Sequence, residues 1–487
     1  MSTTFLNRNK YFLSVFGLLI ANFLRFDFYP NEEVQFAFAR EFFDPNWITG
    51  YSSLVDDLGT RALIRYIIGF TLSIFDWLPA LLLLRIVNYI IFAYGLSRLI
   101  KQLNLPLIQS LILLELFFIS PQCLIAGEWI FGGVEAKTFA YGFIFIALSF
   151  YLSQRFNRAI CLLLLASYFH VLVGFWVTVS LLLHFLIFNR KLVSVIKLGG
   201  FYSLGLTPLL LFVISQNQLQ EIVVPDSFSF GINYVNFRVP HHTQIFNNYQ
   251  LFSLTTLGVL LHVSFLFWSV KLVNQRDSTL IELWLIVNSI IMLVILIAMI
   301  DEYILSDQLS LFFAIYPYRL SSLSLLLFLL IIPGLLKNYW STKIIRILAI
   351  FCAFLVSYQV YENYEYSKKP ASKRDDAFNQ VIEFVNHKTS PNTKFLILVD
   401  KQQPPHKAFY RLTGRNNYFV FQFTPHGYQY YYDWVERGKK YYLSNNNRNN
   451  LSKYADKSKY DYVIADSRII DDSLEEIASF HNYYLYR

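Results

Sequence analysis

Long apolar runs, separated by short polar segments, recur along the chain from Tyr11 to Val360. A helix needs about 20 apolar residues to cross the roughly 30 Å hydrocarbon core of a bilayer, where each backbone polar group has to be satisfied within the segment. Only 15% of the 487 residues are charged and 55% are hydrophobic, whereas about a quarter of the residues of a soluble domain are charged. The pattern excludes a disordered chain and an ordinary soluble enzyme, and it predicts a mainly α-helical, polytopic membrane protein.

About eleven segments have the length and apolarity of membrane spans. They are Tyr11–Phe26, Pro79–Ile100, Pro106–Pro121, Thr138–Ser153, Arg158–Leu172, Gly174–Phe188, Val195–Ser215, Leu251–Val273, Leu280–Ile300, Tyr318–Leu336 and Lys343–Tyr361. The segment at residues 61–77 is also apolar, but it carries Arg61, Arg65 and Asp76. We interpret it as a helix lying on the membrane surface, because counting it as a span would place most of the basic loops outside.

The basic residues favour one orientation in the membrane. Lys and Arg number 41 against 33 Asp and Glu, and the cytoplasmic loops of membrane proteins carry such an excess. With the N-terminus in the cytoplasm, most of the short basic loops fall inside, so we attribute the excess to topology and not to nucleic-acid binding. We expect a multi-pass protein of the plasma (inner) membrane with an extracytoplasmic C-terminal domain.

The composition changes after Tyr361, where the charged, proline-containing segment Glu362–Arg374 is typical of a linker. We therefore expect a membrane domain at residues 1–365 and a soluble domain at residues 366–487. In the soluble domain one segment at helical spacing predicts a helix and three short runs predict strands; in chain order they are Asp376–Lys388, Lys394–Val399, Asn417–Phe423 and Tyr460–Ala465. Their alternation predicts a small α/β domain. Its tyrosine-rich segment 428–434 favours either saccharide binding or a packed aromatic core.

With this topology, the outer loops collect carboxylates, cations and histidines. The first outer loop, residues 27–60, holds Glu32 and Glu33 about one helical turn past the first span. The other candidate functional residues are Glu128, Glu135, Lys137, His170, Arg238, His241, His242 and Arg319. A carboxylate can deprotonate a hydroxyl group, and cationic side chains can hold a phosphate. Each of these residues can also have a purely structural role. Exposed carboxylates are often only solvated, and Arg319 can anchor a helix end. His241 and His242 are adjacent, but the sequence shows no further residues that would complete a metal site with them.

Short motifs resemble those of the GT-C superfamily of integral-membrane glycosyltransferases. Asn31-Glu32-Glu33 stands just past the first span, where that superfamily has an acidic motif, and the following VQFAFAREFFDPNW resembles its surface helix. Further stretches resemble a bacterial branch of the superfamily, and they are Gly132–Phe143, Ser167–Trp176, Asn236–His242 and Tyr316–Ser321. Asn31 departs from the usual pattern, because many members have an acid there, and this leaves open which glutamate acts.

The resemblance implies a GT-C-like helix bundle that moves a sugar from a polyprenyl-phosphate-type lipid donor to a glycan, lipid or protein acceptor on the outer face of the membrane. The implied roles are a base at Glu32 or Glu33 and a second acid at Glu128 or Glu135. The resemblance also implies that four side chains bind the phosphate, and these are Arg238, His241, His242 and Arg319. Lys137 and His170 would support them. The resemblance leaves the cofactor open, including a divalent metal.

Two other classes of protein remain as alternatives. A transporter or lipid flippase would have internal repeats and broken helices in both halves, and no clear repeat is visible in the sequence. A non-catalytic membrane component of polysaccharide or lipid-glycan assembly would need no base. The glycosyltransferase hypothesis requires the first-loop glutamates, Glu128 and the Arg238–His242 segment to line one cavity. No motif encodes the sugar, the acceptor or the linkage.

Overall fold

The computed structural model describes residues 3–48, 61–216, 223–238, 240–243, 252–275, 279–305, 308–336, 340–369, 375–400, 404–421, 423–425, 428–454 and 457–487. Contacts between residues divide the chain into two compact units. Unit 1 comprises Met1–Leu24, Arg85–Leu209 and Ser229–Asn363, and unit 2 comprises Arg25–Leu84, Leu210–Phe228 and Tyr364–Arg487.

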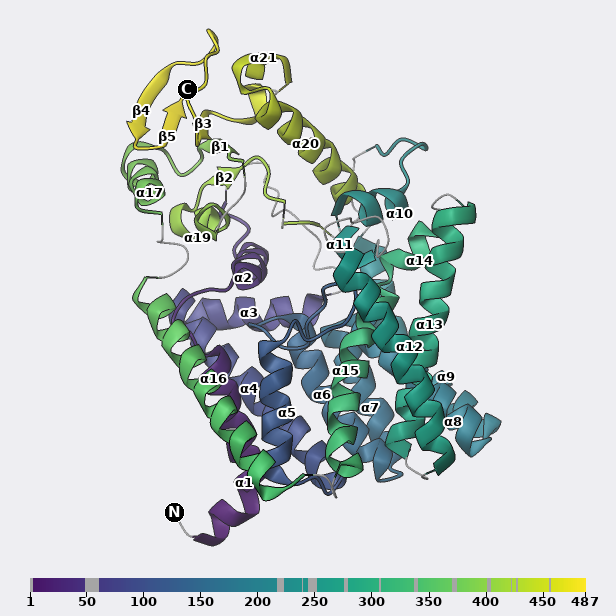
Figure 1. The fold of residues 1–487 in the computed structure, drawn as a ribbon. Coiled ribbons are helices and arrows are strands. Elements are labelled where there is room, and N and C mark those ends of the chain that lie inside the picture. The colour runs from purple at the N-terminus through teal and green to yellow at the C-terminus, as the bar shows by residue number, and fades with distance from the viewer. Residues whose placement is uncertain are drawn as a thin grey trace. The chain divides into compact units, whose positions relative to one another are not determined.

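Unit 1 is a bundle of apolar helices. Its long elements, three of which continue into unit 2, are α1 (Thr3–Phe23), α4 (Trp77–Gln102), α5 (Leu107–Ile119), α6 (Ala136–Leu152), α7 (Phe156–Phe169), α8 (Val171–Asn189), α9 (Leu192–Gln216), α12 (Phe252–Gln275), α13 (Thr279–Ile300), α15 (Leu320–Leu335) and α16 (Thr342–Lys368). Each predicted span is a helix, and α13 packs against α12, α15 and α8 (Figure 1). Within the described residues, seven helices are long and apolar enough to cross a membrane. The prediction of a mainly α-helical polytopic membrane protein is confirmed.

Three of the predicted spans form helices that are shorter than a complete crossing requires. Helices α5, α6 and α7 have 13, 17 and 14 residues, against the roughly 20 that span a bilayer. The run at residues 158–188 consists of two helices, as predicted, but the break lies at His170 and not at Val173–Gly174. Helices α7 and α8 approach closely at Gly174, where a Cβ atom would lie 2.1 Å from Ser167 Oγ. Glycine is therefore needed for this tight helical hairpin.

Short elements lie between the long helices of unit 1. They are α10 (Phe230–Asn233), η2 (Tyr234–Arg238), α11 (Pro240–Thr243), η3 (Asp301–Leu305), α14 (Ser310–Ala314) and η4 (Pro317–Arg319). Elements η2 and η3 are single π-helical turns, a conformation that occurs frequently at functional sites. Both lie between predicted membrane spans.

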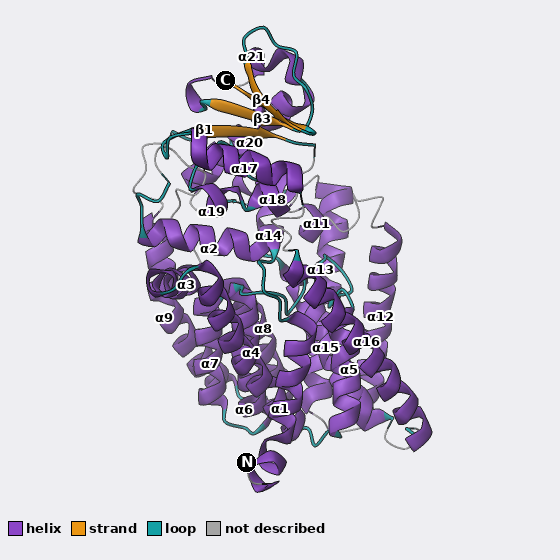
Figure 2. Ribbon diagram, turned by 90° about the vertical axis from the view of Figure 1, so that its left-hand side faces the viewer, coloured by secondary structure: helices purple, strands orange, loops and turns teal. Residues whose placement is uncertain are grey.

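The C-terminal part of unit 2 is built on a five-stranded mixed sheet of order β2-β1-β3-β5-β4 (Figure 1). Its strands are drawn in orange in Figure 2. The strands are β1 (Lys394–Leu398), β2 (Asn416–Asn417), β3 (Tyr462–Ala465), β4 (Glu476–Phe480) and β5 (Tyr483–Tyr486). Strand β1 runs parallel to β2 and β3, whereas β5 is antiparallel to both β3 and β4. The helices are α17 (Asp376–Lys388), α18 (Pro404–Lys407), α19 (Phe409–Thr413), α20 (Tyr428–Asn446), η6 (Arg448–Asn450), α21 (Leu451–Tyr454) and η7 (Lys457–Lys459). The predicted α/β architecture is confirmed.

Helix α17 covers one face of this sheet. Its Phe378, Val381 and Val385 are buried in one core with alternate residues of β1, including Phe395 and Ile397. Leu396 and Leu398, which point to the opposite face because side chains alternate along a strand, are buried as well. Both faces of β1 are therefore covered, and α20 also contacts this strand. Of the predicted strands, 394–399 and 460–465 are confirmed, whereas at 417–423 only the first residue belongs to a strand.

Unit 2 also contains the first outer loop, with α2 (Pro30–Phe43) and α3 (Ala62–Ile74). Helix α2 shares a hydrophobic core with the C-terminal part of the chain, and this core consists of Val34, Ala37, Phe38, Ile48, Tyr410, Val420 and Phe423. Helix α3 packs along α2, and at 13 residues it is too short to span a bilayer. Residues 49–60 of the predicted loop lie outside the described residues.

Candidate functional site

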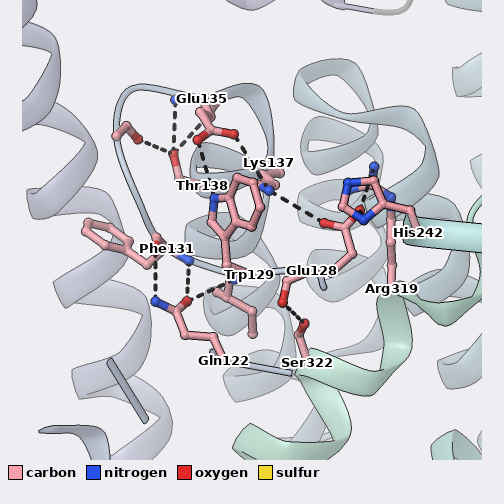
Figure 3. A network of polar contacts seen from close by, with 12 residues as sticks. Gln122, Glu128, Trp129, Phe131, Glu135, Lys137, Thr138, His242, Arg319 and Ser322 are labelled. Carbon is pink, nitrogen blue, oxygen red and sulfur yellow. Dashed lines mark hydrogen bonds and ion pairs between the residues drawn. The ribbon is translucent and has the colours of Figure 1, made fainter. Parts of the chain in front are cut away.

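In unit 1, a lysine, an arginine and a histidine surround a buried carboxylate. Glu128 belongs to the loop that joins α5 to α6, and it is only 4% exposed. Arg319 approaches its Oε1 to 3.3 Å, and Lys137 Nζ lies 3.5 Å from its Oε2. His242 Nδ1 lies 3.9 Å from Oε1. Figure 3 shows the three side chains converging on Glu128 from α6, α11 and η4. Four of the residues that the sequence singles out thus meet in one cluster.

The charges around Glu128 keep it ionised. Burial raises the pKa of Glu128, but Arg319, Lys137 and His242 outweigh this effect and lower the pKa from 4.5 to about 2. A carboxylate with such a low pKa is a poor proton acceptor at neutral pH, where an effective general base has a pKa near 7. Glu128 is therefore suited to holding the three cations together rather than to moving protons.

Lys137 is further held by an aromatic ring and a second carboxylate. Its Nζ lies 3.4 Å from the centroid of the Trp129 ring, a cation–π contact, and 3.7 Å from Glu135 Oε2. Trp129 Nε1 donates a long hydrogen bond of 3.4 Å to Glu135 Oε1. Two permanent cations, Lys137 and Arg319, thus face two carboxylates. The site is close to charge balance, and its cations are already oriented.

Arg319 retains a hydrogen-bond donor that no described residue uses. Its Nε is buried and has no hydrogen-bond partner among the residues that the structure describes. The guanidinium lies over the Tyr316 ring, 4.6 Å from its centroid. An unused buried N–H group costs free energy, so this donor points to a ligand that it can bond.

Tyr316 has a backbone conformation that is unusual for its residue type. Its φ and ψ are 49° and 58°, in the left-handed region that bulky residues rarely adopt. The ring lies edge-on to His242, and its hydroxyl donates to Tyr234 Oη at 3.1 Å. Burial raises the pKa of Tyr316 well above its ordinary value, although Arg238 and Arg319 oppose this. The phenol is therefore a neutral hydrogen-bonding group beside the cations, and strained residues of this kind concentrate at functional sites.

Serines at the start of α15 hold the loop that carries Glu128. Ser321 Oγ accepts from the backbone N–H groups of Leu124 at 3.2 Å and Ile125 at 3.3 Å. Ser322 Oγ donates to the Glu128 carbonyl at 3.2 Å, a bond that Figure 3 shows. Within the loop, Gln122 bonds the backbone of residues 130 and 131 through both its amide oxygen and its amide nitrogen. These bonds fix the position of the carboxylate relative to Arg319.

Ser321 is itself fixed by a buried polar chain. Because its oxygen accepts two N–H groups, its own hydrogen is left for His262 Nε2, 2.9 Å away. The protonated Nδ1 of His262 then donates to Asn288 Oδ1 at 3.2 Å, which also accepts from Ser324. Every member of this chain has a partner of the correct type, as buried polar networks require. His262 is thus a core histidine that is satisfied by the neighbouring helices α13 and α15.

His242 also joins the loop through its ring. Its Nδ1 lies 2.7 Å from the carbonyl oxygen of Ala126, so this nitrogen carries the proton and donates. Ala126 has a φ of 65°, and the following Gly127 has a φ of 57°. These left-handed conformations turn the Ala126 carbonyl toward His242, which ties α11 to the Glu128 loop.

The other residues predicted to bind or support the phosphate are Arg238, His170 and His241, and they come from different segments of the chain. Arg238 ends the π-helical turn η2 and acts electrostatically on Tyr316, but it is not among the cations within 4 Å of Glu128. His170 is the corner between α7 and α8; its N–H bonds Ala166 at 2.8 Å and its carbonyl accepts from Gly174 at 3.1 Å. The side chain of His241 lies outside the described residues.

Glu32 and Glu33 belong to unit 2 and have different partners. Glu32 Oε2 accepts from the backbone N–H of Tyr29 at 2.8 Å, which satisfies one of the free N–H groups at the start of α2. Glu33 accepts two hydrogen bonds of 2.7 Å each from Arg411 of α19. Both carboxylates are buried. Glu32 and Glu33 thus belong to unit 2, whereas the Glu128 cluster belongs to unit 1, and the contacts of each set are described within its own unit.

No metal cluster is found in the part of the chain that the structure describes; no group of three or more His, Cys, Asp or Glu residues there has a suitable arrangement.

The aromatic segment at residues 428–434 serves packing in part, since Phe228 contacts the rings of Tyr428, Tyr431 and Tyr432. Sequence reasoning missed Trp129 and Tyr316 as site residues, although Tyr316 opens one of the motifs that resemble GT-C proteins.

No protein-family model and no curated protein matches the sequence. The fold is similar to that of a crystal structure of ArnT from Cupriavidus metallidurans bound to undecaprenyl phosphate, with a TM-score of 0.53 and 10% sequence identity; the match covers 99% of this chain and 97% of that chain. An apo crystal structure of the same protein matches with a TM-score of 0.42 and 10% identity, over 99% of this chain and 98% of that chain. At this identity the first match shows the fold alone, and it confirms the expected GT-C-like fold, because ArnT is a GT-C glycosyltransferase.

Proposed function

We propose that the protein is an integral-membrane glycosyltransferase that moves a sugar from a polyprenyl-phosphate-type lipid donor to an acceptor on the outer face of the membrane. The observation that carries this proposal is the buried convergence of Lys137, His242 and Arg319 on Glu128, in a chain with the fold of ArnT. The ArnT crystal structure contains undecaprenyl phosphate, and a phosphate is the ligand that lysine, histidine and arginine bind together.

The cluster suits the departure of a phosphate from a sugar. In the transfer, the acceptor hydroxyl oxygen bonds to the anomeric carbon while the bond from that carbon to the phosphate oxygen breaks. The phosphate leaves with the bonding electrons, and a base takes the hydroxyl proton. Arg319 offers its unused Nε–H, and Lys137 and His242 add positive charge, so the developing negative charge is stabilised by groups that are already in place.

The acids divide into two roles. Because the cations lower its pKa to about 2, Glu128 is assigned to hold them in position when no phosphate is bound. Glu135 holds Lys137 in the same way at a longer distance of 3.7 Å. The base is therefore assigned to the first outer loop, at Glu32 or Glu33. Arg238, His241 and His170 are retained as further ligands or supports of the donor, with Arg238 acting next to Tyr316.

The test is to incubate the purified protein in lipid nanodiscs with a panel of polyprenyl-phosphate sugars and to follow release of the polyprenyl phosphate. Lys137→Gln and Arg319→Gln should each lower kcat/KM by about 10-fold or more, because each removes a charge-assisted contact worth roughly 1.5–3 kcal/mol. Lys439→Gln is the matched control, since the Lys439 side chain is 52% exposed and pairs with Glu436, another exposed residue. Parallel reactions with Mg²⁺ and with EDTA decide whether a divalent metal is needed.

Failure to bind or turn over any member of the panel would overturn the proposal. Binding of the lipid without sugar transfer would favour a non-catalytic component of glycan assembly instead. If Lys439→Gln lowered kcat/KM as much as Lys137→Gln, the cluster would not be the donor site.

A further inference from the structure

The C-terminal part of the chain provides an arginine to an acid of the first outer loop. Arg411 Nε donates to Glu33 Oε2, and its terminal nitrogen donates to Oε1, each at 2.7 Å. This is a two-pronged pair between residues that are 378 positions apart in the sequence. The Glu33 side chain is 4% exposed and that of Arg411 is 15% exposed, so little water competes for either group.

The arginine is held on a second side by an aromatic ring. The Arg411 guanidinium lies over Phe28, 4.5 Å from the ring centroid, and Phe28 in turn packs edge-on against Phe36 of α2. The residue before it, Tyr410, is buried in the core that α2 shares with the C-terminal part of the chain. Both members of the pair are therefore fixed by packing, as a preorganised site requires.

The pair leaves lone pairs of the Glu33 carboxylate for a further hydrogen-bond donor, such as an acceptor hydroxyl group. Each carboxylate oxygen has two lone pairs, and the two bonds from Arg411 occupy one on each oxygen. The remaining lone pairs are free of Arg411, and the planar guanidinium prevents rotation of the carboxylate. Glu32 differs, because its Oε2 accepts from the Tyr29 N–H as a local cap of its own helix.

We infer that Arg411 is a positioning residue for Glu33, and that Glu33 rather than Glu32 is the base of the transfer. This inference rests on the proposed glycosyltransferase function. It makes the C-terminal domain a part of the catalytic apparatus rather than an appended binding module, because the orientation of the base depends on a side chain from that domain.

The first arm of the experiment compares conservative variants in the donor-turnover assay. Arg411→Lys keeps the charge but loses the planar fork, so kcat should fall on the order of 10²-fold, as expected for a misplaced catalytic group, while KM for the lipid donor stays within about twofold of wild type. The matched control is Arg437→Lys, since Arg437 is a buried arginine of the same domain that pairs with Asp433 at 2.7 Å; its kcat should stay within about twofold of wild type. A wild-type kcat in Arg411→Lys would overturn the inference.

The second arm separates a positioning role from a purely structural staple. The charge-swapped variant Glu33→Arg/Arg411→Glu restores an ion pair, so its melting temperature should recover relative to either single substitution. Its activity should remain as low as that of Glu33→Gln, because the carboxylate is no longer on α2. Recovery of both stability and activity would show that the pair is only a staple and would overturn the inference. A wild-type protein without transfer on any donor would instead refute the proposed function, so the two failures are distinct.

Discussion

Replacing Glu128 with glutamine tests whether this carboxylate holds the cation cluster together. The substitution keeps the shape of the side chain but removes its charge. Arg319 then loses the carboxylate at 3.3 Å, and Lys137 keeps its longer contact with Glu135. The lowering of the Glu128 pKa from 4.5 to about 2 corresponds to about 3 kcal/mol of favourable interaction with its surroundings. Breaking a buried ion pair by removing one partner costs roughly 3–5 kcal/mol. We therefore expect Glu128→Gln to lower the free energy of unfolding by about 3 kcal/mol.

The pH dependence of this loss gives a second, independent check. The folded pKa of Glu128 lies below its unfolded value, so its contribution to stability is complete above pH 4.5 and is lost as the pH falls toward 2. The difference in stability between the wild type and Glu128→Gln should therefore be constant near neutral pH and should narrow below pH 4.5. Denaturant titration of the purified protein in detergent, repeated at several pH values, measures both quantities.

The matched control for Glu128→Gln is Glu135→Gln. Glu135 lies in the same loop, but its contact with Lys137 is longer, at 3.7 Å, and its side chain is more exposed. Its removal should cost no more than about 1 kcal/mol, as for a weak ion pair. The reasoning would be refuted by a loss below about 1 kcal/mol for Glu128→Gln, or by equal losses for the two variants, because either result would mean that the cations do not depend on Glu128.

Four further measurements test the fold and the site. Ser321→Ala removes the acceptor of two backbone N–H groups of the Glu128 loop, so it should cost about 2 kcal/mol of stability and lower donor turnover. Gly174→Ala should lower the melting temperature and cost about 1–3 kcal/mol, because its Cβ would lie 2.7 Å from a backbone nitrogen of α7. Burial raises the pKa of Glu41 to about 7, so the free energy of unfolding should fall as the pH rises from 4.5 to 7. This fall should be absent in Glu41→Gln, and equal pH profiles of stability for the two proteins would contradict the reasoning. Asp44→Cys and Asp400→Cys, made in a background without native cysteines, should react with a membrane-impermeant thiol reagent from the same face of sealed vesicles, and labelling from opposite faces would contradict the shared core of unit 2.

The sequence predicts the helices of this protein because burial in a bilayer has a strong local signal. An uninterrupted apolar run needs only its own backbone to satisfy its hydrogen bonds, so the predicted spans coincide with observed helices. Helix Asp376–Lys388 was predicted with the bounds that are observed, since its apolar residues follow the helical period and Asp375 caps its start. Strand β4 was missed because it is mostly exposed and lacks an apolar alternation. The run at 417–423 is apolar for another reason, since Val420 and Phe423 pack against α2.

The sites are harder to predict because their contacts join distant parts of the chain. The proximity of Glu128 and Lys137 can be expected from the short loop between them, but the approach of His242 and Arg319 depends on how the helices of unit 1 pack. The conformation of the loop depends on left-handed residues and on Ser321, none of which has a sequence signature. No local pattern in the sequence indicates that Arg411 pairs with Glu33. The sequence therefore does not distinguish Glu32 from Glu33 as the base.

The shared core of unit 2 constrains the predicted number of membrane crossings. Helix α2 of the first outer loop is buried together with Tyr410, Val420 and Phe423, so the first loop and the C-terminal domain lie on the same side of the bilayer. The number of crossings between them must then be even. Ten of the predicted spans lie between the surface segment at residues 61–77 and the C-terminal domain, which satisfies this condition, whereas counting that segment as a further span would make the number odd. Length alone does not separate helix α3 from the predicted spans, because α5 also has 13 residues. The predicted surface position of this segment is therefore favoured by the parity that the unit 2 core imposes and by its charged residues Arg61, Arg65 and Asp76.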